Sequence, residues 1–224
     1  MPKAGSPVYL SGPMFSKADV AQQDEIALVL EKAGFVTYQP QRDGIELAQV
    51  MGDINAPPLP AEVVTAVMPF VRKLVFAVDV YQLLDRCRSV VFNLDGRVPD
   101  DGSVMEAAVG WTAGLPVVIY KTTPITMLGG HDNPMVAGLS MRWSDVDDVA
   151  DLPKAVAAAV ALDKRLGGPR YQPGSHAQRV VALGRKVWRR MPEIHAIARL
   201  GPAQMEAAAL KLMRELGPLV DAAT

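Results

Sequence analysis

The fold is decided by one stretch, residues 89–120, which reads SVVFNLDGRVPDDGSVMEAAVGWTAGLPVVIY. Its two ends, residues 89–94 and 116–120, are nearly continuous runs of apolar β-forming residues, which are typical of buried parallel strands. Between them, residues 102–113 predict a helix that ends at Gly114. A strand, a helix and a second strand in this order predict a parallel sheet covered by helices on both faces.

The same alternation is present upstream of this stretch. Residues 8–10 predict a first strand, 18–32 a helix and 35–38 a second strand. Residues 61–86 look helical, but proline lacks a backbone N–H and clashes with the preceding turn. We therefore expect two consecutive helices here, with a break at Pro69. The predicted fold class is α/β, with a doubly wound parallel sheet.

The last third of the chain predicts an α-helical C-terminal extension. An alanine-rich helix is expected over residues 149–166, and two more helices over 178–191 and 202–216. No strand pattern follows the fourth predicted strand. We therefore expect an α/β domain over residues 1–146 and a helical extension over residues 147–224.

A basic segment lies within this extension. Residues 164–190 hold eight of the 23 lysines and arginines and no acidic residue. Only Tyr171 and Trp188 interleave with these charges, which is too few for a base-stacking platform. A solvated helix face, or one that contacts protein, is therefore favoured over a nucleic-acid site, and nucleic acid is not an expected partner.

Composition excludes several classes of protein. The chain has a net charge of −1, so it has no overall field that would gather polyanions. Cys87 is the only cysteine, and the three histidines are scattered, so we expect no disulfide, metal site or other cofactor. The first residues lack the apolar stretch of a signal peptide, and no run has the length and apolarity of a membrane span. We therefore expect a cytoplasmic protein with no membrane partner.

Glu106 is the first candidate for chemistry. In an open parallel sheet, ligands bind beyond the carboxyl ends of the strands, and the loop after residues 89–94 is rich in acids and leads to Glu106. It is the only charged residue between Ser103 and Tyr120. The positive end of its helix can keep the carboxylate anionic and nucleophilic. An outward-facing glutamate at a helix start is the alternative interpretation of this residue taken alone.

Asp79 repeats this pattern, since it is the only charge between Lys73 and Asp85, although taken alone it is more typical of a helix surface. These two isolated acids, with Asp100 as a third, suggest glycosyl-transfer chemistry. One carboxylate can attack or stabilise an anomeric carbon while another, with a raised pKa, protonates the leaving group. The motifs of dinucleotide-binding proteins, P-loop NTPases, serine hydrolases and zincins are absent from the sequence.

The order and spacing of these residues resemble the nucleoside 2-deoxyribosyltransferase family. The resemblance spans about residues 7–145 and is carried by VYLSGPMFS at 8–16, Asp79, DGRVPDDGSVMEAAVGW at 95–111, PVVIYK at 116–121 and DNPMVAG at 132–138. It implies a flavodoxin-like parallel sheet. It also implies that the base of a 2′-deoxynucleoside is exchanged with retention, through a covalent deoxyribosyl ester on a glutamate.

The resemblance also assigns three catalytic residues. Glu106 matches the nucleophile, and Tyr9 matches the tyrosine that holds its carboxylate in place. Asp79 matches the aspartate that meets the base and protonates it. The expected partners are small-molecule nucleosides and free nucleobases, with no cofactor and no metal.

Further residues are expected to bind the substrate. They are Asp100 at the sugar, Asn133, Met135, Gly12, Phe15 as a cover of the pocket, and Gln41 at the base edge, with Gln39 as the alternative. Asn133 and Met135 match an Asn-x-Met pair that a neighbouring subunit contributes in the family. The resemblance therefore implies a homo-oligomer with shared active sites.

Two other functions stay open. A related branch hydrolyses deoxynucleoside 5′-monophosphates and carries serine where Asp100 stands, and a carboxylate there would repel a phosphate dianion unless Arg97 offsets it. The third candidate is a nucleotide-binding module without turnover, since a fold alone does not determine function. The presence of Tyr9, Asp79, Asp100 and Glu106 in one chain argues against that module.

Overall fold

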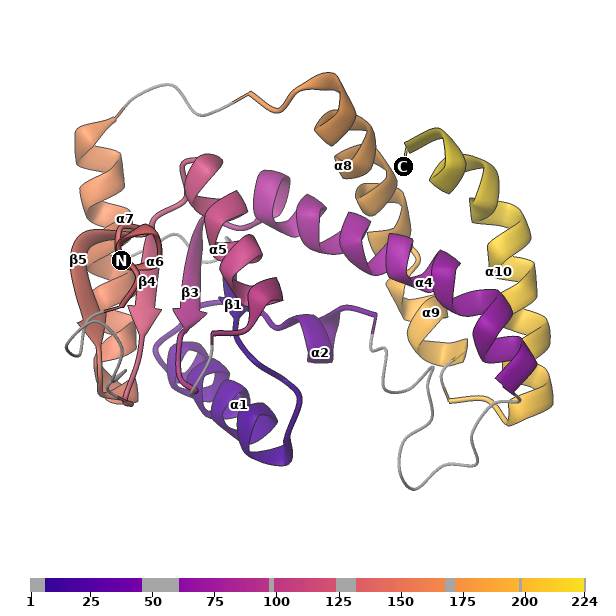
Figure 1. Cartoon of the computed structure of the whole chain (residues 1–224), viewed down its shortest axis with the longest axis horizontal. Helices are drawn as coiled ribbons and strands as arrows, with labels where there is room; N and C mark the ends of the chain where they lie inside the picture. The colour runs from indigo at the N-terminus through magenta and orange to yellow at the C-terminus, as the bar shows by residue number, and fades with distance from the viewer. Residues whose placement is uncertain are drawn as a thin grey trace. The chain divides into compact units, whose positions relative to one another are not determined.

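The computed structural model of the chain describes residues 7–45, 61–96, 99–123, 132–167, 172–197 and 199–223. It divides into two compact units, which are described one at a time. The sheet unit comprises Met1–Gln39 and Gln82–Gln172, and the helical unit comprises Pro40–Tyr81 and Pro173–Thr224. The chain is shown in Figure 1.

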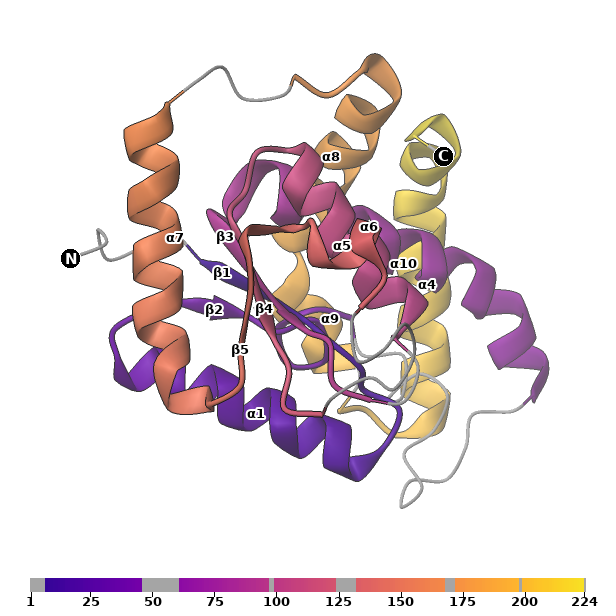
Figure 2. The same cartoon turned by 60° about the vertical axis from the view of Figure 1, so that its left-hand side comes forward.

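A five-stranded parallel sheet forms the centre of the sheet unit within the described residues (Figure 2). The strands are β1 (Val8–Ser11), β2 (Thr37–Tyr38), β3 (Ser89–Asn93), β4 (Val117–Tyr120) and β5 (Ser140–Val146). Their spatial order is β2-β1-β3-β4-β5, and each neighbouring pair is parallel. This is the flavodoxin-like order, in which the chain reverses direction across the sheet between β1 and β3. The predicted α/β, doubly wound fold is confirmed.

The sequence did not predict β5. Its segment, SMRWSDV, mixes polar with apolar residues, because an edge strand is paired on one side only. Val117 of β4 pairs with Ser140, whereas Ile119, two residues on, pairs with Asp145, so β5 carries a bulge. Within that bulge Trp143 has a left-handed backbone (φ 54°) and an exposed ring. The bulge breaks the apolar alternation by which strands are recognised.

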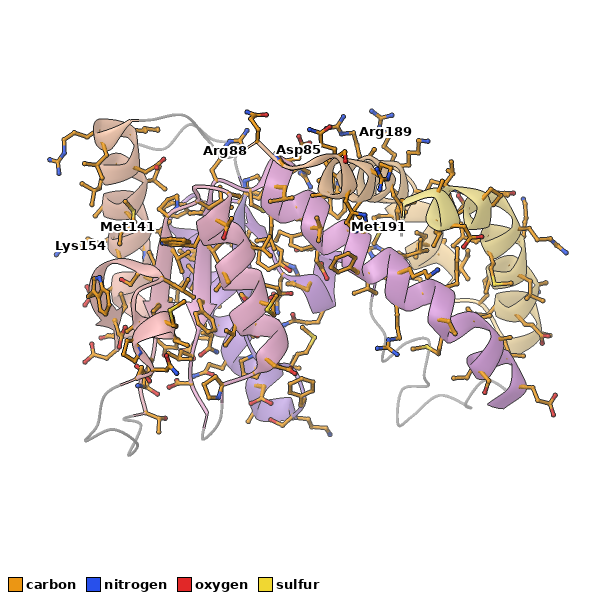
Figure 3. All side chains as sticks on the ribbon, turned by 45° about the horizontal axis from the view of Figure 1, so that its top comes forward. Asp85, Arg88, Met141, Lys154, Arg189 and Met191 are labelled. Atoms are coloured by element: carbon orange, nitrogen blue, oxygen red, sulfur yellow. The ribbon has the colours of Figure 1, made fainter. Side chains whose placement is uncertain are left out.

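Two helices cover one face of the sheet, as Figure 2 shows. They are α1 (Lys17–Lys32) and α7 (Leu152–Leu166), and α1 begins with a capping box between Ser16 and Asp19. The core on this face comprises Val8, Leu10, Val91, Val118, Tyr120, Ile26, Ala27, Leu30, Leu152 and Val156. The exposed side chain of Lys154 extends away from α7 (Figure 3). The α7 helix therefore buries one stripe against the sheet and exposes the other.

The opposite face carries α5 (Asp101–Thr112). Gly110 lies where this helix comes closest to the sheet, since a Cβ at that position would lie 2.7 Å from Cγ2 of Val90 on β3. Any larger residue would push α5 off the sheet. The sheet unit is completed by a π-helix at Gln82–Arg86, the short α6 (Pro134–Ala137) and a 3-10 turn at Val149–Asp151.

The helical unit is assembled from two separate parts of the chain. The first part contributes α2 (Pro40–Asp43) and α4 (Ala61–Tyr81), and the second contributes α8 (Ser175–Trp188), α9 (Met191–Ile197) and α10 (Pro202–Ala223). Helices α4, α8 and α10 pack against one another. Gly184 of α8 lies against the backbone of α4, since a Cβ there would lie 1.9 Å from the carbonyl oxygen of Ala77.

The predicted break at Pro69 is wrong. Helix α4 continues through this residue as one helix from Ala61 to Tyr81. Proline removes one backbone hydrogen bond, but most helical stability comes from packing an apolar face. Val67, Phe70 and Leu74, which flank the proline, are all buried in the helical unit. Their burial offsets the missing bond.

The C-terminal helices are present, as predicted, but the compact units do not follow a boundary after residue 146. Helix α7 packs on the sheet and belongs to the sheet unit. Helix α4, from the first half of the chain, groups with α8 and α10. None of the helices in the described ranges is long and apolar enough to cross a membrane.

Candidate active site

Glu106 is held by two hydroxyl groups of the neighbouring strand β1. The hydroxyl of Tyr9 donates to Oε1 of Glu106 at 2.8 Å, and the hydroxyl of Ser11 donates to Oε2 at 2.7 Å. Tyr9 and Ser11 are fully buried, and Glu106 is half-buried. Each carboxylate oxygen therefore has a donor from a rigid central strand, which fixes the orientation of the carboxylate.

The alternation of side chains along β1 explains why the hydroxyls of Tyr9 and Ser11 reach the same carboxylate. Successive side chains on a strand point to opposite faces. Val8 and Leu10 pack into the core on the face of α1 and α7, so Tyr9 and Ser11 point to the face that α5 covers. Glu106 lies on the second turn of α5, directly above them.

The surroundings of Glu106 change its acidity. Burial, and to a lesser extent the negative charge of Asp100, raise the pKa of Glu106 from 4.5 to about 7, while the hydroxyls of Ser11 and Tyr9 act in the opposite direction. Burial disfavours the ionised form, and a hydrogen bond to the carboxylate favours it. The carboxyl group is therefore close to half ionised near neutral pH, where it can act as a nucleophile or a base.

Asp100 caps the helix that carries Glu106. Its Oδ2 accepts a hydrogen bond from the backbone N of Ser103 at 2.7 Å and from the Ser103 hydroxyl at 2.5 Å. The side chain of an N-cap satisfies a backbone N–H that has no partner inside the helix. Asp100 therefore determines where α5 starts and, with it, where Glu106 lies.

A cleft of about 530 Å³ opens beside Asp100, at the carboxyl ends of β1 and β3. It is lined by Pro13, Phe15, Asp19, Asp95, Gly96, Pro99, Asp100 and Asp101. This is the point where the strand order reverses, which is where open α/β sheets bind their ligands. Phe15 is 79% exposed at the rim, so it can cover a bound ligand.

Asp95 ties two loops of this cleft together. It accepts hydrogen bonds from the backbone N–H groups of Thr122 and Thr123, from the Thr122 hydroxyl and from Gln22, all between 2.7 and 2.9 Å. Burial raises the pKa of Asp95, but these hydrogen bonds outweigh burial and hold it below its usual value. Asp95 thus joins the loop after β3 to the loop after β4. Asp95 was not among the residues predicted to form the site, although its position directly after a strand was an available signal.

Gly12 follows β1 in a place where no side chain fits. A Cβ there would lie 1.6 Å from Nε2 of Gln23 and 2.8 Å from Cβ of Asn93. The glycine therefore lets the loop after β1 pass close to α1. Its expected contact with the substrate stays a prediction.

Asn133 and Met135 lie apart from the residues described as lining the cleft. Both are exposed, and Met135 is 82% exposed on α6, where Oδ1 of Asn133 accepts from the Met135 backbone N at 2.9 Å. A nearly buried ion pair precedes them, in which Nζ of Lys121 lies 2.7 Å from Oδ2 of Asp132. Their expected contribution to the site of a neighbouring subunit stays a prediction.

Asp79 and Gln41 belong to the helical unit, and their expected contacts with the nucleobase also stay predictions. Asp79 is half-buried on α4. Nε2 of Gln41 is buried and has no hydrogen-bond partner in the described part of the chain. Gln39, the alternative for the base edge, donates from Nε2 to Asp24 at 2.8 Å.

Ser11 is a second residue of the site that was not predicted from the sequence. The available signal was its spacing, since it stands two residues after Tyr9 and so shares its face of the strand. As for metal ions, the described residues contain no group of three His, Cys, Asp or Glu that could hold one.

The fold and this site together define the class. The chain is a flavodoxin-like α/β protein in which two hydroxyls bind Glu106, and Asp100, the N-cap of the same helix, lines a cleft at the point where the strand order reverses. Glu106 itself is not among the residues that line this cleft. The family model described as nucleoside 2-deoxyribosyltransferase matches residues 8–149, well over half of the chain, and the chain belongs to that family.

A solved structure supports the fold. A 2-deoxyribosyltransferase from the psychrotolerant bacterium Bacillus psychrosaccharolyticus superposes with a TM-score of 0.50 at 17% identity, covering 69% of this chain and 96% of that one. A conserved protein from Enterococcus faecalis V583 matches with a TM-score of 0.46 at 18% identity, covering 69% of this chain and 99% of that one. No curated protein matches the sequence. At such identities the likeness concerns the fold alone.

Proposed function

We propose that this protein exchanges the nucleobase of 2′-deoxynucleosides through a covalent deoxyribosyl ester on Glu106, with retention at the anomeric carbon. The observation that carries the proposal is the Glu106 carboxylate, which is held at both oxygens by Tyr9 and Ser11 on a helix whose N-cap, Asp100, lines the cleft. Membership of the nucleoside 2-deoxyribosyltransferase family supports the substrate class.

The first half of the reaction forms the ester. An oxygen of Glu106 bonds to C1′ as the bond from C1′ to the base nitrogen breaks, and the electron pair of that bond stays on the nitrogen. A proton must reach the departing base, and Asp79 is the proposed donor. The second half reverses these steps with a different base, so two inversions give net retention.

The geometry of Glu106 suits the role of nucleophile. A carboxylate with two fixed donors loses little orientational freedom when it attacks. Its pKa, raised by burial to about 7, leaves it both substantially ionised at neutral pH and a better nucleophile than an ordinary exposed carboxylate. Asp100 fixes the helix that carries it and lines the cleft, where it can contact the sugar.

The charge of the cleft favours nucleosides without phosphate. Its described lining residues include four aspartates, Asp19, Asp95, Asp100 and Asp101, and no lysine or arginine. A phosphate dianion would be repelled by these carboxylates. We therefore rank the hydrolysis of deoxynucleoside 5′-monophosphates second. Arg97, which could offset this repulsion, lies outside the described residues.

The proposal includes a second subunit. Transfer to a base must compete with transfer to water, so the pocket has to close. Met135 is 82% exposed, which suits a residue that covers a site on another copy of the chain. A homo-oligomer with shared sites and a cytoplasmic location both remain proposals.

An exchange assay tests the function. The protein is mixed with thymidine or deoxyadenosine and a second free base, and the products are separated. A new deoxynucleoside indicates transfer, and free base with deoxyribose or its phosphate indicates hydrolysis. No product from these nucleosides or from a deoxynucleoside 5′-monophosphate would leave only the binding module. Glu106→Ala is expected to abolish exchange, and Glu25→Gln, at an exposed glutamate of α1, serves as the control. Exchange by Glu106→Ala at the parent rate would remove Glu106 from the role of nucleophile.

A further inference from the structure

Ser11 has two acceptors for one proton. Its Oγ lies 2.7 Å from Oε2 of Glu106 and 3.0 Å from the backbone carbonyl oxygen of Ser103. A serine hydroxyl carries a single hydrogen, so it donates to one of these oxygens at a time. Ser11 is completely buried, so water does not supply a third partner from bulk solvent.

We propose that the Ser11 hydroxyl alternates between these acceptors with the charge of Glu106, and that Oε2 is the oxygen that bonds to the sugar. The hydroxyl donates to Oε2 while the carboxylate is ionised, and turns to the Ser103 carbonyl once Oε2 has bonded to a proton or to C1′. The part that concerns the sugar rests on the proposed function.

The chemistry of an ester explains the choice of oxygen. When a carboxylate becomes an ester, its carbonyl oxygen remains a good hydrogen-bond acceptor, whereas the oxygen bonded to carbon becomes a poor one. Tyr9 donates to Oε1, which therefore suits the carbonyl position. Only the donor to Oε2 loses its acceptor, and that donor is Ser11, which has a second acceptor within reach.

The second acceptor removes a penalty that the ester would otherwise carry. A buried donor left without an acceptor destabilises the state that contains it. The carbonyl oxygen of Ser103 can accept the hydrogen bond from Ser11 because such an oxygen has two lone pairs, and the hydrogen bond within the helix uses only one of them. Its position is fixed, since the N–H and hydroxyl of Ser103 both bond to Asp100. Thus the cap of α5 also places the alternative acceptor for Ser11.

The return of the hydroxyl assists the second half of the reaction. When the incoming base displaces the sugar, the bond between Oε2 and C1′ breaks and its electron pair stays on Oε2. The developing negative charge draws the Ser11 proton back from the carbonyl of Ser103. A hydrogen bond that strengthens as negative charge develops on Oε2 stabilises the transition state more than it stabilises the ester.

The alternation of the Ser11 hydroxyl between its two acceptors can be measured without any substrate. Protonation of Oε2 should turn the hydroxyl toward Ser103 just as the ester does. The carbonyl ¹³C shift of Ser103, followed by NMR against pH, should therefore show an inflection at the pH where the Glu106 carboxyl itself titrates. In Ser11→Ala, Glu106 should still titrate, at a higher pH, while the inflection at Ser103 is lost. Tyr9 and Asp100 are the other titratable groups that act on Glu106, and both are kept in this variant.

Kinetics test the part that concerns the sugar. Loss of a hydrogen bond to a charged group should slow the exchange by Ser11→Ala about ten-fold or more, and move the acidic limb of its kcat/KM profile to higher pH. Ser11→Thr retains the hydroxyl and should restore most of the rate. Ser89→Ala, at a buried serine at the start of β3, should leave rate and profile unchanged.

The outcomes separate the two proposals. A Ser103 inflection that persists in Ser11→Ala, or is absent from the parent protein, overturns the alternating hydroxyl. If the exchange rate and the pH profile of kcat/KM are unchanged in Ser11→Ala, the proposed role of Ser11 in the reaction is overturned. If the parent protein shows neither exchange nor hydrolysis, the proposed function fails, and the NMR result still decides the behaviour of Ser11.

Discussion

Replacing Glu106 by glutamine should stabilise the protein, and only at high pH. The carboxyl of Glu106 ionises at about pH 7 when folded and at 4.5 when unfolded. Between these values the unfolded chain binds fewer protons than the folded one, so stability falls as pH rises. At about 1.4 kcal/mol per pH unit, this lowers the free energy of unfolding by about 3 kcal/mol above pH 7. Glutamine, which does not ionise, removes this loss.

Urea unfolding of Glu106→Gln and the parent protein at about pH 4 and about pH 8.5 measures the effect. The fit of the amide to the two hydroxyl donors does not change with pH, so any cost of the substitution itself is the same at both pH values and cancels in the difference. We expect the variant to gain about 3 kcal/mol relative to the parent between the lower and the higher pH. Glu25→Gln should gain nothing. An equal difference at both pH values would refute the argument that burial governs Glu106.

Three further predictions concern other parts of the molecule. Gly184→Ala should destabilise the protein by about 1–3 kcal/mol or more in urea unfolding, because the new Cβ meets the backbone of Ala77, whereas Gly217→Ala, with open space around it, should be neutral or slightly stabilising. Asp95→Asn should cost about 1–3 kcal/mol in the same assay, because an amide NH₂ would face N–H donors that the carboxylate now accepts; an unchanged midpoint would contradict this. The kcat/KM for exchange should rise with pH and level off above about pH 7, as Glu106 ionises, and a profile that falls over that range would argue against a carboxylate nucleophile.

The central strands could be predicted because they are buried on both faces. Residues 89–94 and 116–120 contain hardly any polar residues, which leaves little choice but a parallel strand. The edge strand β5 was not predicted because the bulge at Trp143 interrupts its alternation of apolar and polar residues. The break expected at Pro69 was wrong because the usual effect of proline on a helix is local. In α4 it is outweighed by packing against helices that are distant in the sequence.

The site was partly open to prediction from sequence. Glu106 stood out as an isolated charge, and the structure places the Tyr9 hydroxyl on its carboxylate. Ser11 could have been found from the two-residue period of the strand, but its second acceptor could not, because the carbonyl of Ser103 reaches it only through the packing of α5 on β1.

The composition of the helical unit bears on any attempt to obtain a smaller enzyme. The chain passes between the two units after residues 39, 81 and 172, so the helices after Pro173 complete a layer that α4 began. Deleting them would remove α8 and α10, which pack on α4, and would expose the part of α4 around Ala77 that lies against Gly184. Such a surface invites aggregation. Trimming this protein at its C-terminus would therefore damage an internal segment, and a shorter version would need the outer face of α4 redesigned with polar residues.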